Sequence, residues 1–313
     1  MQVDVVIPAY NSAAWLEDAI RSVLEQSRPA ARVIVVDDGS TDGTDAVLRR
    51  FAGRIEVVRH PSNRGLPAAR NSGIRAGGSE LVAFLDADDV WPKDKLEKQS
   101  TEFEGSDPPG LSYTGIVECD MLLRPLGRPR RFKRREREHV FEELFVDAFP
   151  IPPSTAMVRR SVFDSCGLFD ESMLKAQDYE FWLRVAMRFT VSCLPEPLCY
   201  RRVNPNSITA RSGHEKHLHY SYRAFELCAK AAAQAGIRLP MSVAERKVLF
   251  LRRCYRECLR WGDRIGEEFF RRMLVEAGAF SAVDAVLAGA ARYTHAIKRM
   301  ARARWVRRAA TDR

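Results

Sequence analysis

The chain has 313 residues, of which 46% are hydrophobic and 29% charged. It is therefore long and apolar enough to bury a sizeable core, and its composition excludes a disordered, collagen-like or disulfide-stapled protein. The formal net charge is +9. The basic excess is concentrated in the segments 128–138 and 292–313, which leaves the rest of the chain mildly acidic.

Strand and helix patterns alternate four times in the first 90 residues. Short apolar runs predict strands at 3–7, 32–36, 55–58 and 81–85, and helical periodicity predicts helices at 12–26, 44–51 and 66–76. Continuous apolar strands of this kind belong in a parallel sheet that helices cover on both faces. Polar pairs follow three of these strands, so we expect them to meet at the carboxyl edge of the sheet, where such folds bind ligands.

The later chain predicts a mixed second half and a helical end. We expect a hairpin at 111–129, a short helix at 139–149, a strand at 154–158, a helix at 181–188 and paired strands at 190–202, broken at Pro195 and Pro197. Strand patterns cease at about residue 214. The sequence therefore predicts one α/β domain over 1–210, with halves at 1–110 and 111–210, followed by a helical region over 211–313.

The cysteines and the hydropathy of the chain indicate its compartment. Seven cysteines are scattered without a CxxC pair, which favours a reducing, intracellular environment. No basic and then apolar leader opens the sequence, and no stretch reaches the roughly 18 apolar residues that a spanning helix needs. We therefore expect a cytoplasmic protein that is not integral to a membrane.

Eight short motifs occur in a fixed order along the first two thirds of the chain. They are Ile7–Asn11, Val36–Asp42, Asn63–Asn71, Phe84–Asp89, Pro153–Thr155, Gly167–Asp170, Asp178–Arg184 and Tyr200–Arg201. In this order they resemble the family-2 glycosyltransferases of the GT-A fold. The resemblance implies a GT-A type, Rossmann-like nucleotide-binding sheet in 1–110 and an acceptor side in 111–210. It also implies inverting transfer of a sugar from a nucleotide-diphosphate donor, which we expect to be UDP-linked, to an acceptor hydroxyl.

A metal site is expected where the fourth strand ends. Breaking the glycosidic bond leaves negative charge on the nucleotide diphosphate, and a divalent cation held by carboxylates neutralises such charge. Mn²⁺ or Mg²⁺ prefers oxygen ligands, and one or two carboxylates suffice. By resemblance, Asp88 binds the metal, and Asp86 faces the ribose or the metal's water shell. The alternative is a solvated acidic turn that caps a helix beginning near Pro92.

The resemblance also assigns residues to the nucleotide and to proton transfer. Pro8 and Tyr10 would line the base pocket, Asp38 would read the base edge, and Arg70 would meet the base or the diphosphate. The alternatives are a strand-end aromatic for Tyr10 and an ion pair with an edge aspartate for Arg70. Asp178 takes the place of the base that accepts the acceptor's proton, with helix capping as its alternative.

Two positions depart from the family pattern. Gln177 stands where a Glu usually precedes the base, and the loss of that negative charge would lower the pKa of Asp178. Asn204 stands where many relatives carry a His near the metal or diphosphate, so the metal requirement is open. These departures alone favour the competing hypothesis of a non-catalytic nucleotide-sugar-binding or membrane-docking module. A nucleotidyltransferase is disfavoured because residues 8–11 do not form a Gly-rich phosphate loop.

Three further segments carry candidate binding residues. His214, His217 and His219 form an HxxHxH pattern, which we interpret as a solvated helix face because zinc needs four convergent ligands. The basic segment 128–138 is either an anionic-acceptor site or a solvated excursion. The segment 291–308 predicts a basic helix suited to an anionic membrane surface, with a solvated tail as the alternative and nucleic acid disfavoured. We expect a glycan or lipid-linked acceptor in cell-surface polysaccharide, glycolipid or glycan synthesis.

Overall fold

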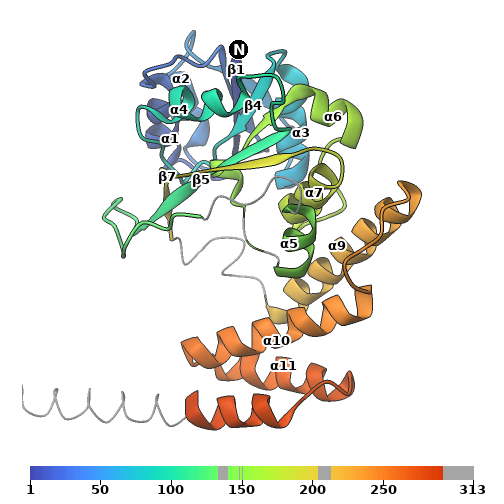
Figure 1. The fold of residues 1–313 in the computed structure, drawn as a ribbon. Coiled ribbons are helices and arrows are strands. Elements are labelled where there is room, and N and C mark those ends of the chain that lie inside the picture. The colour runs from blue at the N-terminus through green and yellow to red at the C-terminus, as the bar shows by residue number, and fades with distance from the viewer. Residues whose placement is uncertain (133–139, 148, 150, 204–212, 292–313) are drawn as a thin grey trace, which may run out of the picture. The chain divides into compact units, whose positions relative to one another are not determined.

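The computed structural model describes residues 1–132, 140–147, 149, 151–203 and 213–291. The chain forms two compact units, Met1–Leu239 and Pro240–Arg313. The first unit contains one seven-stranded sheet with the strand order β3-β2-β1-β4-β6-β5-β7 (Figure 1). Its strands are β1 Val3–Ala9, β2 Arg32–Asp37, β3 Glu56–Arg59, β4 Leu81–Phe84, β5 Leu111–Cys119, β6 Met157–Arg159 and β7 Val191–Arg202.

The parallel half of the sheet confirms the predicted α/β class. β1 pairs in parallel with β2 and β4, and β2 pairs in parallel with β3. β1 and β4 are buried along their whole length, as expected for parallel strands covered by helices on both faces. The covering helices include α1 Leu16–Leu24, α2 Thr44–Arg49, α3 Leu66–Ala76 and α4 Lys95–Ser100.

The alternation of side chains along the strands assigns these helices to faces. Val3, Val5 and Ile7 of β1 belong to a core cluster with the apolar residues of α1, α2 and α4. Ile34 and Val36 of β2 pack on the opposite face, against Ala69 of α3. α3 lies very close to β1: a Cβ added at Gly73 would stand 2.3 Å from Val6 Cγ1. The absence of a side chain at Gly73 therefore lets α3 lie close to the sheet. This close packing sets the positions of the side chains in the first two turns of α3.

The second half of the sheet differs from the prediction at residues 190–202. Instead of paired strands, these residues form the single strand β7, which runs parallel to β5 with irregular register between Thr114 and Val117. Pro195 and Pro197 lie at this irregularity, because a proline has no N–H to give to a regular ladder. Gly115 faces them closely, since a Cβ there would lie 2.9 Å from the Pro195 carbonyl oxygen.

The other helices of the first unit pack around an aromatic cluster beside β4. They are α5 Val140–Asp147, α6 Arg160–Cys166, α7 Gln177–Ala186 and α9 His214–Gln234. Phe225 of α9 lies 6.0 Å from the Tyr179 ring of α7 and 6.3 Å from the Phe145 ring of α5. α9, which follows the boundary predicted near residue 210, packs on α7 in this way and belongs to the compact unit Met1–Leu239.

The second unit is helical, as predicted for the end of the chain. It contains α10 Val243–Trp261, α11 Arg264–Glu276 and a helix over 282–291. Ser242 and Glu245 form a capping box at the start of α10, and Asp263 caps α11 through Gly266 N. None of the described helices combines the length and apolarity needed to cross a bilayer.

Candidate active site

The polar pairs predicted at the strand ends meet at the carboxyl edge of the parallel strands. β1 leads directly into Tyr10, β2 ends at Asp37, and β4 leads within two residues to Asp86. Pro8 is buried within β1, whereas the Tyr10 side chain is 46% exposed. Of the two residues predicted to line a base pocket, Tyr10 therefore has a ring that a ligand can reach, whereas Pro8 lies in the buried part of β1.

The turns that follow β1 and β2 are tied to each other. Ser40 N donates to Asp37 Oδ1 at 3.0 Å, and Ser40 Oγ accepts from Asn11 N at 3.0 Å. Asn11 Oδ1 in turn accepts from Thr41 N at 2.8 Å. Asn11 has a positive φ of 49°, a conformation that Asn tolerates better than most residues. Asp37 thus braces the turn.

Asp38 is engaged with the protein itself. Its side chain is 3% exposed, and its two oxygens accept hydrogen bonds from Arg64 N at 2.9 Å and Gly65 N at 2.8 Å. His60 Nδ1 lies 2.6 Å from Asp38 Oδ1, and His60 Nε2 lies 2.9 Å from Ser72 Oγ. This geometry makes Asp38 the brace of the loop that begins α3, and it does not support the predicted reading of a base edge.

His60 is a site-supporting residue that the sequence reasoning missed. It is 22 positions from Asp38, and no motif around it announced the contact. A signal was nevertheless present: His60 lies two residues after the apolar strand predicted at 55–58, and a buried His has to satisfy two ring nitrogens.

Arg70 forms the ion pair with an edge aspartate that was its alternative role, and it keeps donors for a ligand. The side chain is 1% exposed, its Nη2 donates to Asp86 Oδ1 at 2.8 Å, and its guanidinium lies 5.6 Å from the centre of the Phe169 ring. Its Nε and Nη1 have no hydrogen-bond partner among the described residues. A buried guanidinium with unused donors is costly, and an anionic ligand at this edge would satisfy them.

The acidic motif after β4 divides its carboxylates between solvent and interior. Asp86 and Asp88 are half-buried, whereas Asp89 is 4% exposed. Ser154 Oγ donates to Asp89 Oδ2 at 2.6 Å and accepts from Asp86 N at 3.1 Å. Burial, followed by the negative charges of Asp86 and Asp88, raises the pKa of Asp89 well above its ordinary value.

The two accessible carboxylates fit a divalent cation that also uses ligands from its substrate. In the described part of the first unit, no three His, Cys or carboxylate ligand atoms converge. Asp86 and Asp88 alone supply hard oxygen ligands, and Asp86 is already paired with Arg70. Mg²⁺ and Mn²⁺ accept one or two carboxylates when phosphate oxygens and water complete the shell. The donor set therefore suits a metal that arrives with a diphosphate.

Asp178 lies in the first turn of α7 and is not its N-cap residue. The N-cap residue is Ala176, which has a left-handed φ of 53°, and its side chain makes no capping hydrogen bond. Asp178 Oδ1 accepts from the adjacent Tyr179 N at 2.8 Å, so it satisfies one first-turn N–H of the helix, and both its predicted role as a base and the capping alternative stay predictions. Burial raises the pKa of Asp178, the positive charge of Arg70 opposes that rise, and Asp86 adds to it. The lowering expected from Gln177 is relative to a Glu at that position and stays a prediction.

α7 is held firmly beneath Asp178. Tyr179 Oη donates to Leu144 O at 3.0 Å, and Trp182 Nε1 donates to Ile151 O at 3.0 Å. Gln177 is 6% exposed, and its Oε1 has no partner among the residues that the structure describes. A left-handed non-glycine residue at the helix start is strained, and such strain is typical of functional sites.

Several predicted segments fall partly or wholly outside the described residues. Asn204, residues 133–138 of the basic segment and residues 292–308 of the predicted basic helix all lie there. The described part of the basic segment contains Arg130, which donates to Glu118 Oε1 at 3.0 Å. The three histidines of the HxxHxH pattern lie in α9.

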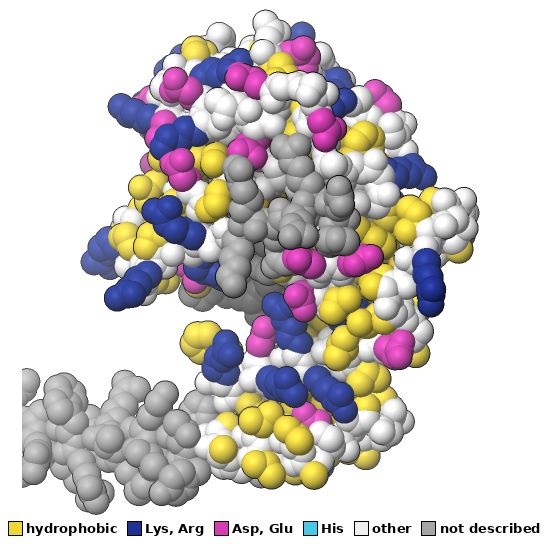
Figure 2. Space-filling view, viewed as in Figure 1, with side chains coloured by type: hydrophobic (Ala, Val, Ile, Leu, Met, Phe, Trp, Pro, Cys, Tyr) yellow, Lys and Arg dark blue, Asp and Glu magenta, His cyan; other side chains and the backbone are white. Residues whose placement is uncertain are grey.

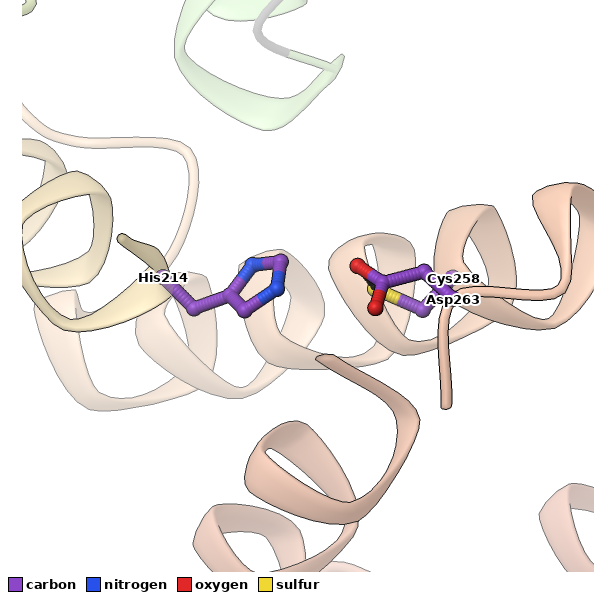
Figure 3. A group of neighbouring side chains, drawn as sticks. All are labelled: His214, Cys258 and Asp263. Carbon is purple, nitrogen blue, oxygen red and sulfur yellow. Dashed lines mark hydrogen bonds between the residues drawn. The ribbon is translucent and has the colours of Figure 1, made fainter. Parts of the chain in front are cut away.

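Figure 3 draws His214, the first residue of α9, together with Cys258 and Asp263 of the second unit. Within that unit, Cys258 Sγ lies 3.8 Å from Asp263 Oδ2 at the junction of α10 and α11. Burial raises the pKa of the Cys258 thiol to about 12, and the charge of Asp263 adds to this effect. The thiol therefore stays protonated near neutral pH, which argues against a reactive cysteine there.

Residues 4–167 match the sequence model of the family described as glycosyl transferase family 2. The putative teichuronic acid biosynthesis glycosyltransferase TuaG of Bacillus subtilis (strain 168) is 34% identical over 214 residues, which are 66% of this chain and 81% of that protein. The uncharacterized glycosyltransferase RT0329 of Rickettsia typhi is 29% identical over 66% of this chain and 65% of its own length.

Two solved structures resemble the fold at low sequence identity. S. aureus TarS 1–349 in complex with UDP-GlcNAc has a TM-score of 0.63 at 18% identity, over 80% of this chain and 70% of that one. The mannosyltransferase PcManGT from Pyrobaculum calidifontis, in complex with GDP-Man and Mn²⁺, has a TM-score of 0.58 at 20% identity, over 94% and 80%. These likenesses confirm the expected GT-A fold.

Proposed function

Because the chain belongs to glycosyl transferase family 2 and is a glycosyltransferase, we propose that it moves a sugar from a nucleotide-diphosphate donor to an acceptor hydroxyl in one inverting displacement. The observation that carries this proposal is the surroundings of Arg70. A buried guanidinium with two unused nitrogens pairs with Asp86, and its charge acts on Asp178. A buried cation with unused donors thus lies close enough to a candidate base for its positive charge to oppose the rise in the pKa of that base.

The donor is assigned to the edge formed by β1, β2 and β4. The exposed ring of Tyr10 offers a face on which a base can stack, and the unused nitrogens of Arg70 suit the diphosphate. Asp38 acts indirectly, because it holds the backbone of Arg64 and Gly65 where α3 begins. We favour a UDP-linked sugar, since TarS is solved with UDP-GlcNAc, although PcManGT is solved with GDP-Man.

Asp88 would hold the divalent cation, Mn²⁺ or Mg²⁺, with Asp86 at its water shell or at the ribose. When bound, such an ion supplies positive charge to the diphosphate that leaves. Asp86 also orients the Arg70 guanidinium through their 2.8 Å contact. Replacing Asp86 would therefore disturb the anion-binding group as well as the carboxylate pair.

Asp178 would accept the proton of the attacking hydroxyl. Its pKa lies above the ordinary value of 3.8, mainly because the half-buried carboxylate is shielded from water by its surroundings. A raised pKa makes a carboxylate a stronger base while leaving it ionised near neutral pH, as long as the pKa stays below the working pH. The firm attachment of α7 to α5 through Tyr179 keeps this carboxylate at a fixed position.

We assign the acceptor to a growing cell-surface polysaccharide, glycolipid or lipid-linked glycan. The Bacillus subtilis relative is named as a putative teichuronic acid biosynthesis glycosyltransferase, which supports a polysaccharide. A lipid-linked acceptor would bring the enzyme to the inner face of a membrane, and the basic segment 291–308 is suited to that contact. The protein would then be peripheral to the membrane.

A donor screen tests this function. Purified full-length protein is mixed with UDP-, GDP- and other nucleotide-linked sugars, with Mn²⁺ or with EDTA, and released nucleotide is measured. We expect slow hydrolysis of one donor class with Mn²⁺ and none in the Asp178→Asn variant. A protein that binds nucleotide diphosphates but releases nucleotide from no donor, with or without an added glycan acceptor, would contradict the proposal.

A further inference from the structure

The helix over 282–291 exposes an almost wholly apolar face. Val283, Val286 and Leu287 are exposed to 61%, 70% and 40%, and their spacing places them on one stripe of the helix. Ala290 continues this stripe and is exposed as well. Large apolar side chains are normally scattered singly on a protein surface, so a continuous stripe indicates a docking surface.

The only charged residue of this helix points the other way. Asp284 is fully buried, accepts from Ser281 Oγ at 2.7 Å, and lies 3.6 Å from Arg252 Nε and 3.8 Å from Arg256 Nη2. Together with buried Ala288, it attaches the helix to α10. The orientation of the helix is therefore fixed by its polar side, and the apolar stripe is left facing outward.

A second exposed apolar pair lies in the same unit. Trp261 and Ile265, at the junction of α10 and α11, are each 80% exposed. Exposed Arg260 and Arg264 stand beside them in the sequence. Figure 2 shows hydrophobic side chains along helix 282–291 and Lys and Arg side chains over the neighbouring α10. The second unit thus exposes both apolar and basic side chains.

The charge of the residues that follow the helix indicates what binds to its apolar stripe. Residues 292–313 contain eight Lys or Arg and one acidic residue, and they follow the apolar stripe directly. A second copy would bring these like charges together, which disfavours self-association. An anionic lipid surface satisfies both features at once, because it accepts apolar side chains at the acyl boundary and cations at the headgroups.

We infer that helix 282–291 lies on an anionic membrane surface, with Val283, Val286 and Leu287 entering the acyl boundary. This inference rests on the proposed membrane contact of segment 291–308 and extends the anchor into the preceding helix. The apolar stripe supplies the hydrophobic part of the binding, and the basic segment supplies the electrostatic part. The affinity for the membrane should therefore fall only in part when the salt concentration is raised.

The test uses the full-length protein and sedimentation with vesicles of phosphatidylglycerol and phosphatidylcholine, compared with phosphatidylcholine alone. The double variant Val286→Gln/Leu287→Gln removes two apolar side chains from the stripe. Its matched control is Leu122→Gln/Leu126→Gln, which removes two exposed leucines of the first unit. The tail variant Lys298→Gln/Arg299→Gln/Arg302→Gln lowers the charge of the basic segment without shortening the chain.

We expect the wild type and the control to sediment with anionic vesicles, and the stripe variant to lose at least about tenfold in apparent partitioning. The tail variant should lose binding mainly at low ionic strength. Val283→Gln, a single change on the same stripe, should lose several-fold, and it serves if the double variant fails to fold by circular dichroism.

Different failures point to different errors. If the stripe variants bind like the wild type while the tail variant does not, the tail alone is the anchor, and this inference is wrong although the membrane contact stands. If the wild type binds neither vesicle, both are wrong. Light scattering that reports a wild-type dimer and a monomeric stripe variant would identify a second copy as the occupant. Nucleotide release by each variant reports separately on the transferase.

Discussion

Two acidic motifs follow β2 and β4, the strands on either side of β1, and the protein uses their carboxylates differently. After β2, Asp38 accepts two backbone N–H groups and contacts His60. After β4, Asp86 and Asp88 stay accessible and only Asp89 turns inward, toward Ser154. The neighbours that supply donors to a carboxylate, more than its place after a strand, decide whether it supports the fold or faces a ligand.

The same comparison separates Asp178 from the structural carboxylates. Among the described residues, the side chain of Asp178 accepts one hydrogen bond, from the adjacent Tyr179 N–H, whereas Asp38 and Asp89 each accept two or more. An enzyme base needs a free lone pair for its substrate. We therefore group Asp178 with Asp86 and Asp88, the carboxylates that we assign to the reaction, and not with the structural carboxylates Asp38 and Asp89.

The largest effect is expected at Asp178. Asp178→Asn removes the base while keeping the shape of the side chain, so transfer should fall by about 10²–10⁴ with little change in donor affinity. Transfer rates and calorimetric binding of the nucleotide diphosphate check this. A variant that keeps more than about a tenth of the wild-type rate would indicate that Asp178 is a structural residue and not the base.

A smaller effect, on stability, is expected at Asp38. Asp38→Asn weakens charge-assisted hydrogen bonds to buried backbone groups, and we expect a loss of about 1–3 kcal/mol in the free energy of unfolding. Urea denaturation measures this loss. Asp45→Asn is the matched control, because Asp45 forms only exposed ion pairs, and its unfolding curve should hardly move. Equal curves for the two variants would show that Asp38 does not brace the loop.

The smallest effect is expected at Gln177. Transfer requires ionised Asp178, so kcat/KM should fall as the pH drops through the raised pKa of this group. Gln177→Glu places a negative charge beside it, which raises that pKa further and moves the acid limb to higher pH. A pH profile with Gln234→Glu, an exposed substitution, provides the comparison. An acid limb that stays in place would mean that another group limits the rate.

The fold and the order of the motifs follow from local patterns. The apolar runs of β1, β2 and β4 have no polar alternation, so they predict a sheet that is covered on both faces, and Pro8 and the aspartates then mark its carboxyl edge. The family resemblance added roles for Asp86, Asp88 and Asp178. Each of these lies at the predicted edge or at the start of α7.

What could not be predicted depends on contacts between distant residues. The contact of His60 with Asp38 and the packing of Phe225 on Tyr179 join segments 22 or more positions apart. The first ties Asp38 to the loop that begins α3, and the second joins α9 to the first compact unit. The rise in the pKa of Asp178 has the same origin, because it comes mainly from the packing that shields the carboxylate from water.

The most direct measurement of the central comparison is the metal dependence of nucleotide-diphosphate binding in Asp88→Asn and Asp38→Asn. Calorimetry with UDP and GDP, each with Mn²⁺ and with EDTA, gives the increment due to metal in every protein. We expect that Asp88→Asn loses the gain in nucleotide affinity due to metal, whereas folded Asp38→Asn keeps it. Loss of the increment in Asp38→Asn but not in Asp88→Asn, or equal binding with Mn²⁺ and EDTA in the wild type, would contradict it.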